Sequence, residues 1–107
     1  MPRAGELWLI DFPFSSGVGS KRRPALVLWV DGPDAVMAVV TSAGRRSDSD
    51  VPLRDWEEAG LLAPSTVRLR RVDTFETSLL IRRLGRLTEH DANELRGAWK
   101  RAVGPQF

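Results

Sequence analysis

The residues of this chain that are best suited to chemistry include three consecutive cations. Lys21, Arg22 and Arg23 follow a loop rich in proline, glycine and serine, and they stand directly before a hydrophobic run that Pro24 opens. Arginine binds phosphate oxygens through two parallel hydrogen bonds, which makes such a cluster a candidate polyanion site. A loop held by strands at both ends would present these cations from a rigid support.

A second cluster combines hydroxyls with arginines at the end of another predicted strand. Thr41 and Ser42 follow the hydrophobic run Ala35–Val40, and Arg45 and Arg46 come shortly afterwards. Hydroxyl and guanidinium groups both hydrogen-bond phosphate oxygens, so together they favour phosphate chemistry. Each cluster taken alone is more typical of a solvated strand end.

Other catalytic arrangements are missing from the sequence. His90 is the only histidine, which excludes a two-histidine ribonuclease mechanism, and the lack of cysteine excludes thiolate zinc sites. Gly17 and Gly19 lack the lysine and the helix that would follow in a P-loop. The acidic residues between positions 48 and 58 suit an exposed polar loop as well as they suit a metal. The sequence therefore predicts neither a metal nor a cofactor.

Length and composition indicate one domain spanning residues 1–107. No apolar run approaches the ~18 residues of a membrane helix, and the start of the chain lacks a signal-peptide pattern. We therefore expect a cytoplasmic protein with no membrane partner. The net charge of +2 is weak evidence for nucleic-acid binding, so the clustering of the cations carries more weight than their sum.

The elements that must position these clusters are mainly strands. The turn Asp31–Asp34 joins two of them as a hairpin, Gly60 closes a helical turn that begins at Asp55, and Gly85 indicates a bulge or a close approach. Periodicity and turn residues predict strands at residues 7–11, 25–30, 35–41, 51–53, 66–72 and 79–87.

A C-terminal helix completes the predicted fold. Thr88 is its expected N-cap, Asp91 completes a capping box, and Gly104 follows its last turn. Trp56 follows a polar turn and is the tryptophan expected to be partly exposed. The sequence predicts a strongly curved antiparallel sheet with one helix packed on it.

Five segments, taken in order, resemble the MazF/PemK toxins of bacterial toxin–antitoxin pairs. They are GELWLIDFPF, GSKRRPALVL, AVVTS, DVPLRDWEEAGLLAPSTVRL and IRRLGRLTEHD, and they cover about residues 5–100. The Arg-Pro that opens the second strand and the Thr-Ser that closes the third are the most specific elements.

The resemblance implies a small SH3-like barrel of the CcdB/MazF type, with the C-terminal helix packed on the sheet. It also implies a homodimer that cuts single-stranded RNA at short sequences, without a metal, by attack of the 2′-hydroxyl on phosphorus. The family's catalytic arginine carries over to Arg23, its catalytic hydroxyl to Thr41, and a contributing loop serine to Ser20. The loop before Arg23 is shorter here than in several well-known members.

The other cations and hydroxyls of the two clusters are then expected to bind RNA, and a cognate antitoxin with an acidic tail is the expected inhibitor. Two alternatives are a CcdB-like poison that binds a protein such as a topoisomerase, and a catalytically silent RNA-binding barrel. Arg22 and Arg23 are adjacent, so either could be the essential arginine. The expected RNA-binding residues are Ser20, Lys21, Arg22, Ser42, Arg45 and Arg46.

Overall fold

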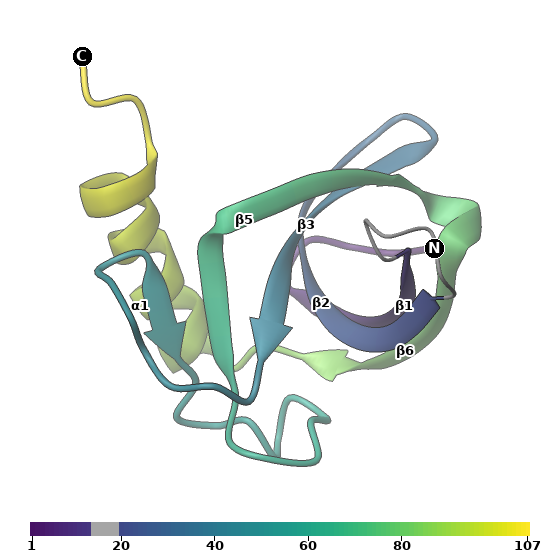
Figure 1. The fold of residues 1–107 in the computed structure, drawn as a ribbon, viewed down its shortest axis with the longest axis horizontal. Helices are drawn as coiled ribbons and strands as arrows, with labels where there is room; N and C mark the ends of the chain where they lie inside the picture. Colours follow the sequence, from purple (N-terminus) through teal and green to yellow (C-terminus); the bar gives the residue numbers. More distant parts are fainter. Residues whose placement is uncertain (14–19) are drawn as a thin grey trace.

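Six strands form one antiparallel sheet in the computed structural model, which describes residues 1–13 and 20–107 (Figure 1). Their order across the sheet is β4-β5-β3-β2-β1-β6. A 3₁₀ turn, Thr77–Leu79, joins β5 to β6, and a π-helical segment, Trp99–Val103, extends the helix. The elements are β1 (Glu6–Pro13), β2 (Ser20–Asp31), β3 (Asp34–Thr41), β4 (Asp50–Pro52), β5 (Thr66–Glu76), β6 (Leu80–Arg86) and α1 (Glu89–Ala98).

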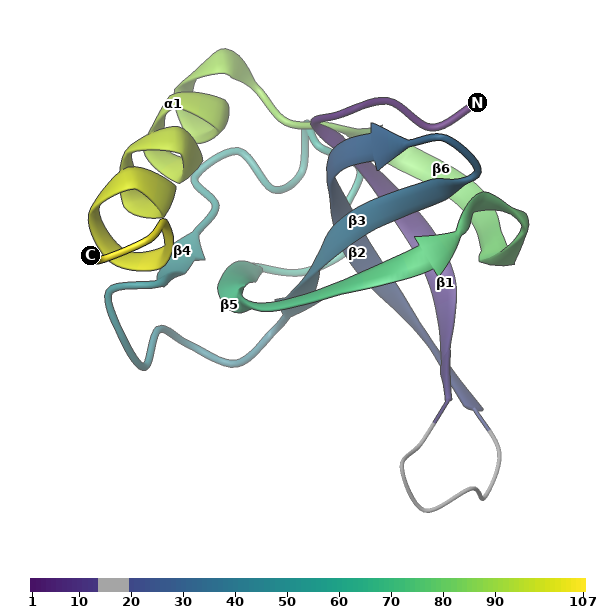
Figure 2. The ribbon, with the colours of Figure 1, turned by 90° about the horizontal axis from the view of Figure 1, so that it is seen from above.

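The three consecutive cations lie inside a strand and not on the loop that the sequence predicts. β2 begins at Ser20 instead of Pro24, because seven consecutive residue pairs with β1 keep residues 20–26 extended. Pairing of β2 with β3 starts only at Ala25, next to Pro24, whose missing N–H is tolerated at such a position. Figure 2 shows β1 and β2 running out together from the rest of the sheet. The Gly-x-Gly sequence at Gly17 and Gly19 lies outside the described residues.

The hairpin between β2 and β3 is confirmed. Gly32 and Pro33 alone connect Asp31 to Asp34, and the φ angle of 59° at Gly32 is one that glycine adopts readily. β5 is longer than predicted, and it turns a corner. Its pairing with β3 jumps from Val72 to Arg68, so residues 69–71 form the sharp bend that Figure 1 shows.

The curled sheet encloses one apolar core and shares a second with the helix. The first lies within the curve of the strands and includes Ile10, Val27 and Met37. The second includes Leu26 and Leu95 and lies between the sheet and α1. The predicted mainly β fold with a packed C-terminal helix is confirmed, although β4 and β6 remain as edges and the sheet is not a closed ring.

Two of the four tryptophans differ in exposure. Trp29 has 45% of its surface exposed, whereas Trp56 is half-buried and packs against the core beneath α1. Trp56 is therefore partly exposed, as predicted, but Trp29 is more exposed. In the part of the chain that the structure describes, neither α1 nor any other helix is long and apolar enough to cross a membrane.

Thr88 caps α1 as predicted, but Asp91 has another role. The Thr88 hydroxyl accepts a hydrogen bond from the Asp91 backbone N–H (3.4 Å) and donates to Asp55 Oδ2 (2.6 Å). The buried Asp91 carboxylate accepts the backbone N–H groups of Arg54 (3.0 Å) and Asp55 (2.9 Å) instead of completing a capping box. These bonds attach the turn at residues 54–60 to the helix.

Gly60 and Gly85 bring the same turn against β6. A Cβ atom on either glycine would overlap the backbone of the other segment, and Gly60 also has a φ angle of 89°. The pairing of β1 with β6 shifts between Leu7, opposite Gly85, and Trp8, opposite Arg83. Both the bulge and the close approach predicted at Gly85 are therefore present, and they set the position of residues 60–65.

Candidate functional site

A pocket of about 380 Å³ opens where the first residues of β2 meet the end of β3, the middle of β6 and residues 60–65. Its wall combines cations, hydroxyls and apolar side chains. The lining residues are Leu9, Lys21, Arg22, Arg23, Pro24, Val40, Thr41, Ser42, Gly60, Leu61, Leu62, Ala63, Ser65, Arg82 and Leu84.

The register of the sheet brings Arg23 and Thr41 to one place. Ala25 of β2 pairs with Val39 of β3, and beyond this pair Arg23 and Thr41 each lie two residues further along their strands. Opposed residues share a face of the sheet, and so do residues two apart along a strand. The two residues that the resemblance implies as catalytic therefore come from neighbouring strands, lie on one face and line the same pocket.

Arg23 and Thr41 have hydrogen-bonding capacity left for a ligand. Arg23 is half-buried, and its guanidinium forms no ion pair or hydrogen bond with any residue that the structure describes. The Thr41 hydroxyl accepts the Ala43 backbone N–H (3.1 Å), which fixes the oxygen and leaves its hydrogen available to donate. The arrangement can hold a phosphate between a half-buried cation and a hydroxyl that the backbone fixes.

Arg22 lies on the face of β2 opposite to that of Arg23, although both residues line the pocket. It lies opposite Asp11, and its Nε is 3.6 Å from Asp11 Oδ1. Side-chain exposures of 67% and 46% make this ion pair weak. Lys21 is exposed and also lines the pocket. Alternation along the strand thus separates two sequence-adjacent arginines into different environments.

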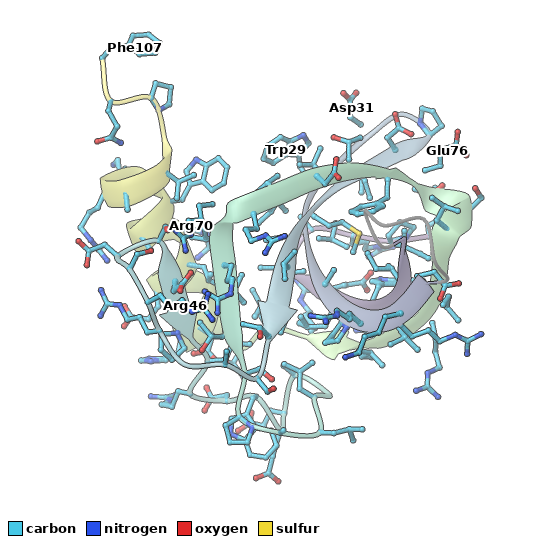
Figure 3. The ribbon with its side chains drawn as sticks, in the orientation of Figure 1. Trp29, Asp31, Arg46, Arg70, Glu76 and Phe107 are labelled. Atoms are coloured by element: carbon cyan, nitrogen blue, oxygen red, sulfur yellow. The ribbon has the colours of Figure 1, made fainter. Side chains whose placement is uncertain are left out.

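The remaining expected RNA-binding residues divide into two groups. Ser42 is exposed and lines the pocket, and Ser20 opens β2 but is described through its backbone only. Arg45 and Arg46 are not among the lining residues. Arg45 donates to Asp48 Oδ1 (2.8 Å) and to the Ser47 carbonyl (3.0 Å), and Figure 3 places Arg46 toward the helix.

The sequence did not indicate two of the polar side chains that line the pocket. Arg82 pairs with Leu9 across β6 and β1, and Ser65 lies just before β5. The basic run of β6 was visible in the sequence. Its contact with the pocket depends on the strand order β2-β1-β6, for which no local signal exists.

Other arginines are committed to structure. Arg68 is buried and its Nη1 lies 2.7 Å from Asp50 Oδ2, and Arg83 Nε lies 2.7 Å from Glu6 Oε2. Burial alone would raise the pKa of Glu6, but hydrogen bonds from Trp8, the Arg3 backbone and Arg83 outweigh it and lower that pKa. These arginines have anionic partners within the fold, unlike Arg23.

None of the described residues that line the pocket is acidic. Hydrogen bonds from Arg54 and Thr88 lower the pKa of Asp55, which lies at the far end of the turn that ends in Gly60. Among the described residues, no group of three histidine, cysteine, aspartate or glutamate side chains is placed to hold a metal ion. The pocket's own chemistry is that of guanidinium, ammonium and hydroxyl groups.

Comparison with solved structures places the fold among bacterial toxins. An endoribonuclease in complex with its cognate antitoxin, from a mycobacterial species, is 20% identical with a TM-score of 0.78, over 100% of this chain and 99% of that one. MazF from Deinococcus radiodurans is 25% identical with a TM-score of 0.69, over 91% of each chain. A MazE–MazF structure from the same organism is 23% identical with a TM-score of 0.70, over 90% of each chain.

A comparison with curated proteins found no match. A family model does match, over residues 3–103, and it describes PemK-like, MazF-like toxins of type II toxin–antitoxin systems. This match covers nearly the whole chain and confirms both the predicted resemblance and the predicted toxin class. The chain belongs to the family of PemK-like, MazF-like toxins of type II toxin–antitoxin systems.

Proposed function

We propose that the chain is a metal-independent, sequence-specific endoribonuclease that cleaves single-stranded RNA by 2′-hydroxyl attack. The observation that carries this proposal is the pocket in which Arg23, without a partner among the described residues, meets Thr41 from the neighbouring strand. The family match and the mycobacterial endoribonucleases of the same fold support the reaction class.

The proposed reaction forms one bond to phosphorus and breaks one. The 2′-oxygen loses its proton and bonds to phosphorus while the bond to the 5′-oxygen breaks, which leaves a 2′,3′-cyclic phosphate and a 5′-hydroxyl. Negative charge builds on the phosphoryl oxygens in the transition state. A guanidinium held at those oxygens stabilises the transition state more than the ground state, and such electrostatic stabilisation is often the largest contribution to catalysis.

Each residue of the pair has a distinct proposed role. Arg23 stays charged at every working pH, so it is a strong stabiliser of the phosphoryl oxygens and an intrinsically poor proton donor. Thr41 donates its free hydrogen to a phosphoryl oxygen or orients the 2′-hydroxyl. Lys21 and Arg22 add charge along the strand for neighbouring phosphates, a contribution that salt weakens.

The proposed partners follow from the same charge. An antitoxin with an acidic tail would occupy the pocket and pair with Arg23, in keeping with the antitoxin complexes solved for proteins of this fold. We further propose a homodimer with an RNA groove across the two copies, in the cytoplasm where the substrate lies. If an uncleavable RNA and the antitoxin tail bind together with unchanged affinities, the shared-pocket proposal is wrong.

The test is cleavage of single-stranded RNA in the presence of EDTA. The unmodified protein should cleave, while Arg23→Ala and Thr41→Ala should each abolish cleavage without unfolding the protein. Arg45→Ala is the matched control, because Arg45 is exposed and lies outside the pocket. Toxicity in cells that survives both pocket substitutions would instead indicate a protein-binding poison.

A further inference from the structure

Arg82 belongs to a row of residues that crosses three strands into the pocket. It pairs with Leu9 of β1, and Leu9 pairs with Pro24 of β2. Residues that are directly opposed in a sheet lie on one face, and all three line the pocket. Arg82 therefore shares a face of the sheet with Arg22, two residues from Pro24, and it lines the same hollow as Arg23.

Arg82 differs from the arginine next to it. Arg83 faces the other side of β6 and is held by Glu6, with 2.7 Å between Nε and Oε2. Arg82 is exposed and forms no ion pair or hydrogen bond with another described residue. Its five donors are available for a ligand.

Apolar side chains line the pocket between Arg82 on β6 and the end of β3. They are Leu9, Pro24, Val40, Leu61 and Leu84, and the volume of about 380 Å³ exceeds what a single phosphate group needs. The hydroxyl of Ser65 donates to the Ala63 carbonyl (2.7 Å) and keeps its lone pairs for a donor. An apolar floor beside a few fixed polar groups is typical of a site for a flat, partly polar ring.

We propose that this apolar wall binds an unpaired base next to the cleaved bond and that Arg82 selects guanine there. A guanidinium offers parallel donors and no acceptor, and guanine presents two adjacent acceptors, O6 and N7. Adenine presents a donor beside N7, so it cannot accept both bonds. Bases of single-stranded RNA are free to show this edge to a protein.

This inference rests on the proposed function, because the base is that of the RNA substrate. The test measures binding to short RNAs that carry a 2′-O-methyl group at every position and cannot be cleaved. Each oligonucleotide carries one guanine or one adenine at a scanned position in a uridine background. Fluorescence anisotropy gives the ratio of dissociation constants for each position.

The protein should bind guanine about tenfold better than adenine at one position. Arg82→Gln should remove this preference or reverse it, because glutamine pairs with adenine N6 and N7. Arg86→Gln is the control: Arg86 is an exposed arginine of the same strand outside the pocket, and its variant should keep the ratio. Thermal melts of both variants, which alter exposed side chains, check folding.

Two results would overturn the inference. One is the absence of a guanine preference in the unmodified protein. The other is an equal loss of affinity for all oligonucleotides in Arg82→Gln, which would make Arg82 a phosphate contact. Cleavage of a matching 2′-hydroxyl RNA is assayed in parallel. Guanine preference without cleavage would contradict the proposed function alone, and cleavage without guanine preference would contradict this inference alone.

Discussion

Two hollows lie at the two ends of β2, and they differ in what lines them. Residues 21–24 line the pocket described above, whereas residues 26–29 line a groove of about 450 Å³ between β2 and α1. Trp29 and Trp99 meet edge-on in this groove, with ring centroids 6.1 Å apart. Among the described residues, none lines both hollows.

The difference between them concerns the sign of the charges in their walls more than the volume. The groove is the larger hollow, and both walls are mainly apolar. The cations of the groove share its wall with Glu89, and Arg96 donates to Asn93 (2.6 Å) and to Glu89 (3.4 Å). Arg23 and Arg82 in the pocket have no such partner within the described residues. Among the described residues, four cations and no acidic side chain line the pocket, which favours a polyanion, so the smaller hollow is the better candidate site.

Among the substitutions that compare the two hollows, Arg23→Lys should lower RNA cleavage most. The substitution keeps the charge but loses the planar donor fork, so we expect a loss of at least ~10²-fold in kcat/KM, the scale of removing one preorganised donor. Arg96→Lys in the rim of the groove is the matched control and should change kcat/KM little. Equal losses in the two variants would remove the distinction between the hollows.

Trp99→Ala tests whether the groove stabilises the fold without taking part in cleavage. Trp99 packs against the core beneath α1 and against Trp29, so we expect the free energy of unfolding to fall by about 2 kcal/mol. RNA cleavage per folded molecule should stay close to that of the unmodified protein. Chemical denaturation and cleavage assays on the same samples provide the measurement, and a selective loss of cleavage would assign the groove a part in catalysis.

Arg22→Ala should have a smaller and different effect from Arg23→Lys. Arg22 is mostly exposed and only weakly paired with Asp11, so its loss should weaken RNA binding modestly. The slope of log affinity against log salt concentration should fall by about 1, as expected for one phosphate contact. Should Arg22→Ala abolish cleavage while Arg23→Lys leaves it intact, the catalytic role would move to Arg22.

The smallest expected effect concerns Glu6, which pairs with Arg83, the arginine next to Arg82. The lowered pKa of Glu6 means that its charged form stabilises the fold, through hydrogen bonds that include the one from Arg83. This contribution is present above the ordinary pKa of 4.5 and is lost as pH falls through the lowered value. Glu6→Gln should therefore flatten the fall of Tm in that acidic range, and an unchanged profile would contradict the assignment.

Local sequence signals predicted most of the fold and about half of the site. The turn at Gly32, the close approach at Gly85 and the cap at Thr88 each depend on one residue type in one local geometry, and all three are present. The cations of residues 21–23 were expected on a loop, because the pairing that extends β2 depends on a partner strand.

The cluster at residues 41–46 shows the same limit of prediction from local sequence. Thr41 ends β3 and lines the pocket next to β2, whereas Arg45 pairs with Asp48 three residues away. Arg82 joins the pocket only because β6 pairs with β1. Trp29 is the most exposed tryptophan, although it lies in a strand. Residue types predicted the chemistry, but strand order decided which of those residues meet.

The central claim is that the pocket cleaves RNA through the 2′-hydroxyl of the substrate itself. The most direct measurement uses an RNA that is cleaved at one known position and a copy with 2′-deoxy at the nucleotide 5′ of that bond. We predict complete resistance of the substituted bond, because no other group on the substrate can attack phosphorus in its place. Cleavage of the deoxy substrate at the normal rate would contradict the mechanism.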